Sequence, residues 1–515
     1  MASQRPNQDE LIERLAAGET FGGRAPERID THISVVFLTA DRAYKLKRAL
    51  TVPYLDYGTL EKRRTFCEAE IEINRRTAPQ IYLRAVPVTL EADGALARCG
   101  DGTPVEWLVE MARFDTDLTL DRVARAGKLE APTVRDLADA IAAFHEKAER
   151  IDTPDGAGVV EPTIGGNARE MRNWLGAPFA AADIDRLVEL QRSRLNANRA
   201  LLDARAAAGM VRRCHGDLHL RNICLIDGRP VIFDAIEFNE RFIRIDVLYD
   251  LSFLLMDFAF NGHPEFANLA FNRYLQRTGD IGGIGLVPLF QSLRAGIRAH
   301  VTAKAAGERA SGKRQEEMRR EAAAYLDLAA GLLRPATPRL IAIGGFSGTG
   351  KSTLARRIAP GLCASPGALT ISSDPIRKRL HGVAPEDRLP ETAYGPEADA
   401  KVFDEMFREA ETALDAGFPA ILDMTFRDGE LRKRAETVAE RAGVPFAGFW
   451  LEADRATLAA RVAARTNDPS DATTGVLDRQ LASGAGEIGW RRIDAAASIE
   501  ESHDRVAAAV ANMDP

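Results

Sequence analysis

The chain has 515 residues, of which 45% are hydrophobic and 28% charged, and its formal net charge is −7 at pH 7. The length suggests about three domains, and the composition is that of a globular protein whose core needs no disulfide or metal support. The five scattered cysteines exclude a disulfide framework and a zinc motif, and the acidic balance gives no basic footprint for nucleic acid.

Three features bear on location. The first fifteen residues, "MASQRPNQDELIERL", are polar and lack the apolar segment of a signal peptide. The longest apolar run, residues 248–260, is short and interrupted by Asp250 and Asp257, so it predicts a buried helix and not a membrane span. The cysteines fit a reducing compartment. We therefore expect a cytoplasmic protein with no membrane partner.

The first 330 residues read as a small mixed lobe followed by a helical lobe. Residues 33–49 predict two strands joined by a tight turn at Asp41-Arg42, and residues 61–77 predict a helix. Residues 120–330 are mostly helical in pattern. The exception is 222–238, which predicts a hairpin around Asp227-Gly228.

The most specific motif of this region is "HGDLHLRN". It places His215, Asp217 and Asn222 in the arrangement HxDxxxxN, and the predicted hairpin then delivers Asp234. Phosphoryl transfer needs a base for the acceptor hydroxyl and two metal ligands. Asp217 fits the base, and Asn222 with Asp234 fit Mg²⁺ ligands. The alternative is a polar loop before a hairpin, in which His215 braces the loop by hydrogen bonds.

Residues 25–330 resemble the aminoglycoside phosphotransferase family, whose fold is similar to that of protein kinases, and "HGDLHLRN" carries the resemblance. The resemblance implies a lysine on the third strand of the small lobe that pairs with a helix glutamate. Lys45 is our candidate, with Lys47 on the same strand face as the alternative. Glu70 is the candidate glutamate, and Glu68 competes with it. Solvent-exposed charge is the other interpretation of each.

The region also departs from the kinase pattern. No GxGxxG precedes Lys45, and "DTHISVVF" stands where the loop over the phosphates is expected. Asp234 is followed by Ala-Ile-Glu, so Glu237 joins the metal site or the acceptor pocket. The resemblance puts the adenine-contacting hinge near Glu110 and Met111. A group of acidic residues follows, which comprises Glu237, Glu240, Asp246 and Asp250. The group favours binding of a cationic acceptor, or else it serves only in helix capping and as surface charge.

Two prolines within residues 332–340 mark the clearest boundary. Downstream, the strand-like runs "RLIAIGG", "ALTISSD", "PAILDMT" and "FAGFWLEA" alternate with helical segments, which predicts a parallel α/β sheet. We therefore expect a kinase-like domain over residues 1–335 and a P-loop domain over 338–515. The small lobe would span about 25–112 and the helical lobe about 113–335.

The stretch "GFSGTGKS" matches GxxxxGK[ST] between a predicted strand and a predicted helix. Gly345 and Gly350 would let the backbone wrap a phosphate, Lys351 would reach the β- and γ-phosphates, and Ser352 would hold Mg²⁺. The alternative is an ordinary glycine-rich turn. The remaining loop residues expected to contact ATP are Ser347, Gly348, Thr349 and Thr353.

Five further residues complete the predicted downstream site. Asp374 follows the second strand, either as base for an acceptor hydroxyl or as a helix cap, and Arg377 would bind the acceptor. Asp423 ends the third strand and would act through Mg²⁺, or serve only as a turn residue. Arg461 and Arg465 share a helix face and would stabilise the transferring phosphoryl group, unless that face is merely solvated.

Residues 338–515 resemble the P-loop kinases of the zeta-toxin, polynucleotide-kinase and chloramphenicol-phosphotransferase kind. The matching stretches are "GGFSGTGKST", "SSDPIRKRLHG", "ILDMTF" and "RVAARTNDPSDA". The resemblance implies Asp374 as the base, Arg377 as the acceptor ligand and Arg465 as the lid arginine.

The whole chain resembles bacterial fusions described as bifunctional phosphotransferase/ATP-binding proteins. We expect each site to transfer the γ-phosphoryl group of Mg-ATP to a hydroxyl of a small molecule. In one alternative the N-terminal domain is a nucleotide-sensing regulator of a single enzyme. In another the C-terminal domain is a polynucleotide or nucleoside kinase, which would need a basic groove; the acidic balance argues against nucleic acid.

Overall fold

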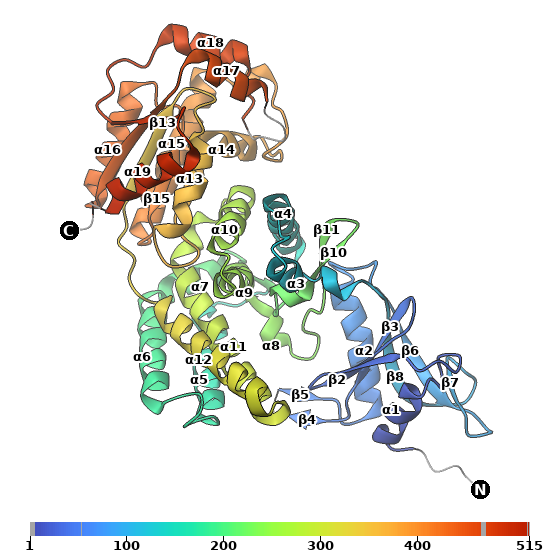
Figure 1. Ribbon diagram of the computed structural model, residues 1–515. Helices are drawn as coiled ribbons and strands as arrows, with labels where there is room; N and C mark the ends of the chain where they lie inside the picture. The colour runs from blue at the N-terminus through green and yellow to red at the C-terminus, as the bar shows by residue number, and fades with distance from the viewer. Residues whose placement is uncertain (1–5, 53, 465–469, 512, 514–515) are drawn as a thin grey trace. The chain divides into compact units, whose positions relative to one another are not determined.

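The computed structural model describes residues 6–52, 54–464, 470–511 and 513 (Figure 1). Its contacts divide the chain into two compact units. Unit 1 comprises Met1–Thr153 with Gly209–Asp250, and unit 2 comprises Pro154–Ala208 with Leu251–Pro515. The fold is mixed α/β, with a kinase-like N-terminal region and a parallel sheet near the C-terminus, as the sequence predicts.

Unit 1 is built on a six-stranded sheet of order β1-β2-β3-β8-β6-β7, in which neighbouring strands are antiparallel. A tight turn joins β2 to β3, but its central residues are Ala40 and Asp41 and not the predicted Asp41-Arg42. The N–H of Thr39 donates to the oxygen of Arg42 at 2.8 Å, and Arg42 already begins β3. The strands are β1 Glu27–Asp30, β2 Ser34–Leu38, β3 Arg42–Lys47, β6 Tyr82–Leu90, β7 Leu96–Arg98 and β8 Thr103–Ala112, with a separate pair β4 Thr51–Val52 and β5 Leu55–Asp56.

The two faces of this sheet pack against different helices. On one face, Tyr44 and Leu46 of β3 pack in a cluster with Leu11 and Leu15 of α1 (Gln8–Ala16). Side chains alternate along a strand, so Lys45 and Lys47 point to the other face, toward α2 (Leu60–Asn74). The alternation thereby turns two lysines toward one helix.

The rest of unit 1 carries the predicted hairpin, β10 (Ile223–Ile226) and β11 (Arg229–Ile232). Asp227 and Gly228 have φ of 50° and 74°, the left-handed conformation of a two-residue hairpin turn. The other elements are α3 Leu120–Arg125, α4 Ala131–Lys147, β9 Val211–Arg213, α8 Glu240–Ile243 and β12 Arg244–Asp246.

Unit 2 contains a helical part and a parallel sheet. The predicted apolar helix is present as α9 (Val247–Phe260), which crosses from unit 1 into unit 2 and is largely buried. Within the described residues, no helix is long and apolar enough to cross a membrane. The helical part comprises α5 Gly156–Arg172, α6 Ala181–Ala197, α7 Arg199–Ala207, α10 Pro264–Thr278, α11 Val287–Arg309 and α12 Gly312–Gly331.

The five strands of the downstream sheet are all parallel, in the order β14-β15-β13-β16-β17. The four strands expected from the sequence are confirmed, and a fifth is added. They are β13 Leu340–Gly345, β14 Leu369–Ser372, β15 Ala420–Asp423, β16 Phe446–Glu452 and β17 Arg491–Asp494. The helices are α13 Lys351–Ile358, α14 Ser373–Leu380, α15 Pro396–Asp415, α16 Gly429–Ala442, α17 Arg455–Ala463, α18 Thr474–Ser483 and α19 Ile499–Ala511.

Candidate active sites

Lys45 lies at the centre of the upstream site. Its Nζ donates to Glu70 Oε1 of α2 at 2.9 Å and to Asp234 Oδ1 at 2.7 Å. Asp234 stands just after β11, 189 residues away along the chain. Glu68, the competing glutamate, instead pairs with Arg64 on the exposed side of α2. The structure therefore brings together the predicted lysine, helix glutamate and metal-binding aspartate.

Lys47 forms a second buried pair beside the first. Its Nζ donates to Glu70 Oε2 at 2.5 Å, and it also contacts Glu237 Oε1. The hydroxyl of Tyr57 donates to the same Glu237 oxygen at 2.5 Å. The side chain of Lys47 is fully buried and that of Glu237 is 5% exposed. Both lysines offered by the sequence thus share one glutamate, and only Lys45 reaches Asp234.

The charges of this cluster stabilise each other. Burial alone would lower the pKa of Lys45, but the carboxylates of Asp234 and Glu70 outweigh it and hold that pKa well above its ordinary value. Burial would likewise raise the pKa of Glu70, yet Lys45 and Lys47 lower it to about 2. Glu70 therefore remains a carboxylate at neutral pH and fixes two ammonium groups.

Asp217 and Asn222 are joined by hydrogen bonds within the catalytic loop. Asn222 Nδ2 donates to Asp217 Oδ2 at 2.9 Å and to the Asp217 main-chain oxygen at 3.0 Å. His215 is buried, which lowers its pKa, so at neutral pH it is uncharged. Its Nε2 donates to the oxygen of Phe233 at 2.9 Å. His215 thus braces the loop against β11, as the simpler interpretation held.

Asp234 is held in an unusual backbone conformation. Its φ is 62°, a left-handed value that a non-glycine residue adopts only when its surroundings impose it. The Asp234 N–H donates to the hydroxyl of Tyr82, and the next N–H, of Ala235, donates to Asn74 Oδ1 at 2.8 Å. Neither Tyr82 nor Asn74 is marked by a sequence motif, since their role lies in contacts distant along the chain.

The acidic group downstream of Asp234 is largely occupied by internal contacts. Asp250 accepts hydrogen bonds from the N–H groups of His215 and Gly216, at 3.0 and 2.9 Å. Glu240 pairs with Arg213 and Arg244. This arrangement favours bracing of the catalytic loop over recognition of a cationic acceptor.

The predicted phosphate-binding loop joins β13 to α13, and close packing requires glycine at two of its positions, Gly345 and Gly348. Gly345 has φ of 142°, and a Cβ there would lie 2.5 Å from the oxygen of Leu451. Gly348 has φ of 89°, and a Cβ there would lie 2.7 Å from the oxygen of Leu458 on α17. Gly350, with φ of 87°, caps α13. The loop is thus wedged between β16 and α17.

The polar residues of the loop differ in their surroundings. Lys351 Nζ donates to the oxygen of Phe346 at 3.1 Å, and Thr349 Oγ1 donates to that oxygen at 2.8 Å. The N–H of Ser347 donates to Gln480 Oε1 of α18 at 2.9 Å. Ser352 and Thr353 are exposed in the first turn of α13, where helix N–H groups and the helix dipole favour an anion.

Asp374 and Asp423 lie at the carboxyl ends of neighbouring strands. Asp423 ends β15 and accepts a hydrogen bond from Ser372 Oγ at 2.9 Å. Asp374 stands in the first turn of α14, whose N-cap is Ser372, so its interpretation as a cap is wrong. Burial, together with the nearby Asp423, raises the pKa of Asp374 despite a hydrogen bond from Ser470. A carboxylate of raised pKa suits general base catalysis.

Arg377 is buried beside Asp374 in a wall formed with Tyr394, Lys378 and Asp471. Its Nη2 donates to Asp399 Oδ1 at 2.6 Å, and its guanidinium lies 4.9 Å from the centre of the Tyr394 ring. Within the described part of the chain, its buried Nε has no hydrogen-bond partner. Asp471 binds the Tyr394 hydroxyl and lies 2.6 Å from Lys378 Nζ. Sequence reasoning missed Lys378 and Asp471, although both stand within stretches that it singled out.

The two predicted lid arginines have different outcomes. Arg461 lies on α17, and its Nη1 donates to the main-chain oxygen of Ala495 after β17, at 2.8 Å. The structure therefore gives it a partner other than the phosphate-binding loop. Arg465 lies outside the described residues, so its role stays a prediction.

Comparisons with known proteins identify two kinds of domain in the chain. The model of the phosphotransferase enzyme family matches residues 61–284, and an AAA domain model matches residues 340–485. A protein of Mycobacterium tuberculosis strain H37Rv, described as uncharacterized, is 31% identical over 482 residues, which are 92% of this chain and 93% of the relative. The chain belongs to the same family as this mycobacterial protein. It joins two kinase-type domains and is an ATP-binding phosphotransferase.

Two solved structures are similar to portions of the chain. A choline/ethanolamine kinase family protein from Mesorhizobium loti covers 64% of this chain and 95% of its own, with 14% identity and a TM-score of 0.39. A gluconokinase from Sinorhizobium meliloti 1021 covers 34% of this chain and 94% of its own, with 20% identity and a TM-score of 0.26.

Proposed function

We propose that the protein carries two catalytic sites, each of which transfers the γ-phosphoryl group of ATP to a hydroxyl of a small molecule. The observation that carries the proposal is the position of Lys45 between Glu70 and Asp234, with Asn222 bonded to Asp217 in the same unit. A lysine held by a helix glutamate and a base held by an amide are the parts that phosphoryl transfer needs.

The upstream reaction follows from these positions. Asp217 accepts the proton of the acceptor hydroxyl, whose oxygen bonds to the γ-phosphorus. The bond between that phosphorus and the β–γ bridging oxygen breaks, and ADP leaves. Lys45 binds the α- and β-phosphates of ATP, and Glu70 keeps its ammonium group in place.

The donor groups fit a magnesium ion. Asp234 offers a carboxylate that is 42% exposed, and Asn222 offers an amide oxygen, both donors that Mg²⁺ prefers. Lys45 and Lys47 carry two formal positive charges, and Glu70, Glu237 and Asp234 carry three formal negative charges. The cluster therefore has a net formal charge of −1. When bound, the ion would neutralise charge on the phosphates.

At the downstream site, Asp374 serves as the base and Arg377 as a ligand of the acceptor. Lys351 binds the β- and γ-phosphates, and Ser352 with Asp423 would hold a magnesium ion. The raised pKa of Asp374 and the partnerless Nε of Arg377, among the described residues, support this assignment. The acceptors are small hydroxyl compounds at both sites.

Calorimetric titration with a non-hydrolysable ATP analogue and Mg²⁺ tests the two-site claim. We expect two nucleotides per wild-type chain, one in Lys45→Met, one in Lys351→Met and none in the double variant. One nucleotide in the wild type, with Lys45→Met unchanged, would contradict an upstream nucleotide site.

A further inference from the structure

The edge of the downstream sheet is covered by a helix that lies before the P-loop domain in the sequence. β14 pairs with β15 on one side only, and it is the first strand in the sheet order. An edge strand presents unpaired N–H and C=O groups that need partners when buried. Here the partners come from α10, which belongs to the same compact unit as the sheet.

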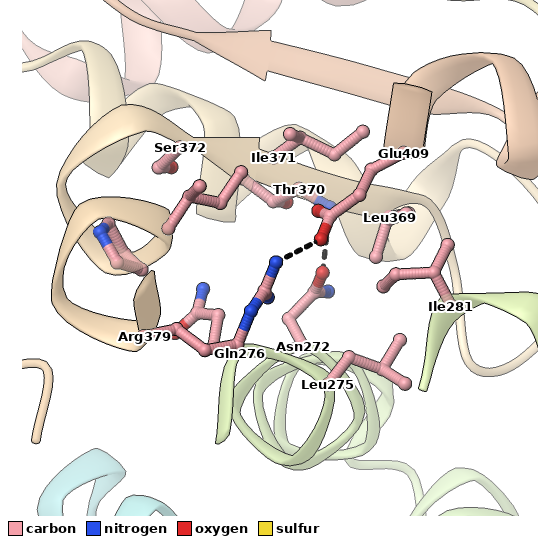
Figure 2. A pocket seen from close by; sticks show the side chains of 12 residues that line it. Asn272, Leu275, Gln276, Ile281, Leu369, Thr370, Ile371, Ser372, Arg379 and Glu409 are labelled. Carbon is pink, nitrogen blue, oxygen red and sulfur yellow. Dashed lines mark hydrogen bonds and ion pairs between the residues drawn. The ribbon is translucent and has the colours of Figure 1, made fainter. Parts of the chain in front are cut away.

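Two asparagines one turn apart on α10 pair with this edge, as Figure 2 shows for Asn272 and Thr370. Asn272 Oδ1 accepts from the Thr370 N–H at 2.7 Å, and its Nδ2 donates to the oxygen of Ala368 at 3.2 Å. Asn268 Nδ2 donates to the oxygens of Ala368 and Pro366 at 3.0 and 2.8 Å. Both asparagines are buried, so their amides take the place of a neighbouring strand.

A third residue of α10 anchors the segment that follows α14. Arg273 is buried, and both of its terminal nitrogens lie 2.8 Å from the carboxylate oxygens of Glu386. The next residue, Asp387, accepts a hydrogen bond through its main-chain oxygen from Lys378 of α14. Lys378 also binds Asp471, the partner of Tyr394. Arg273 is therefore connected, through Glu386, to the wall that contains Arg377.

A second ion pair holds the same C-terminal turn of α14. Arg379 contacts Glu409 of α15, and both line a cavity of about 10 Å³ beside Asn272 and Ser372, drawn in Figure 2. Burial raises the pKa of Glu409, although Arg379 partly offsets this effect. A cavity of this size holds no more than one water, so α10, β14 and α14 are closely packed.

We propose that α10 is a functional element of the P-loop kinase. Its residues Asn272 and Arg273 position β14 and α14, and this positioning sets the affinity for the acceptor. The inference rests on the proposed function, because α14 carries Asp374 and Arg377. Arg273 touches neither substrate, so it is a positioning residue. Hydrogen exchange tests it without knowledge of the acceptor.

The experiment uses the full chain with Arg273→Glu, Glu386→Arg and the two combined, and Glu265→Arg as a charge-reversed control on exposed α10 surface. Amide exchange is measured over residues 369–380. Affinity for the ATP analogue is measured in a Lys45→Met background. The amount of the labelled product whose formation requires Asp374 is measured as a function of the concentration of a small-metabolite extract.

We expect each single variant to speed exchange over residues 369–380 and to raise the half-saturating extract concentration, both by about tenfold, which equals about 1.4 kcal/mol. ATP-analogue affinity should change less than about twofold. The combined variant should restore both quantities. Unchanged exchange, or a loss of exchange protection throughout unit 2 that the combined variant does not restore, would overturn the proposal. Absence of any Asp374-dependent product would count against the proposed function alone, since exchange still reports on α10.

Discussion

Glu70 decides the chemistry of the upstream site, because its two carboxylate oxygens hold two different lysines. Lys45 extends from it to Asp234, and Lys47 extends to Glu237. Lys45 faces Asp234, the proposed metal ligand, and the proposed nucleotide site, whereas the side chain of Lys47 is fully buried. Under the proposed function, the two lysines of this strand therefore have separable roles, Lys45 in catalysis and Lys47 in stability.

Replacing Lys45 by methionine should lower upstream transfer by about 100-fold or more, because the phosphates lose a preorganised positive charge. The rate of product formation, at one ATP concentration that saturates the wild type, measures the effect. Lys62→Met is the matched control, since Lys62 is half-exposed on α2 and pairs only with Asp56. Equal rates in Lys45→Met and the control would contradict the assignment.

Replacing Lys47 by methionine should instead destabilise the fold by about 3–5 kcal/mol, because the buried carboxylates of Glu70 and Glu237 lose a partner. Urea unfolding of the whole chain measures the loss. Arg64→Met removes an exposed pair with Glu68 and should cost less than about 1 kcal/mol. A loss in Lys47→Met no larger than in the control would show that the buried pair contributes little.

The raised pKa of Asp374 makes a prediction about pH. The base acts only when ionised, so downstream transfer should fall as pH drops through that pKa. The fall should lie above about 3.9, the value of an unperturbed aspartate. The pH profile of kcat/KM for the product that Asp374→Asn abolishes measures it. A midpoint at or below the unperturbed value would refute a desolvated base.

Among the elements, the phosphate-binding loop is the most tightly constrained, because two of its glycines face main-chain oxygens of β16 and α17. These contacts explain why the loop motif could be recognised from the sequence alone: the spacing of glycines reflects the backbone itself. The same holds for the hairpin at Asp227-Gly228, whose turn chemistry is local.

Elements whose identity depends on distant partners were not predicted. β17, "RRID", is short and charged, and three of its four residues are exposed, so no apolar run marks it. α1 buries only Leu11, Ile12 and Leu15, within a stretch that reads as a polar N-terminus. The pairing of α10 with β14 depends on asparagine amides, which carry no periodic signal.

Replacing Gly348 by alanine should weaken ATP-analogue binding at the downstream site by about tenfold or more. The new Cβ would meet the oxygen of Leu458, and its left-handed φ disfavours a side chain. Titration in a Lys45→Met background isolates that site. Gly331→Ala, at the end of α12 where a Cβ has open space, should bind the analogue as the parent does. Parent-like binding by Gly348→Ala would argue against this close packing.

Taken as one molecule, the chain combines two kinase-type domains, and its sequence pointed to a candidate site in each because their motifs are short and local. The sequence did not decide which of two candidate residues, such as Lys45 and Lys47, takes the predicted role. Lys45 and Lys47 could be ranked only when Asp234, far along the chain, was seen to reach one of them. The predicted domain limits, 1–335 and 338–515, stay a prediction; the contacts group α10 with the P-loop sheet.

The measurement that bears most directly on two catalytic sites is transfer of γ-labelled phosphate from ATP into a small-metabolite extract. Wild type is run beside Asp217→Asn and Asp374→Asn. We predict that each variant loses a different labelled product and keeps the other, because each removes one base. If Asp217→Asn changes nothing while Asp374→Asn abolishes all transfer, the upstream domain is a binding or sensing module and the two-site proposal is wrong.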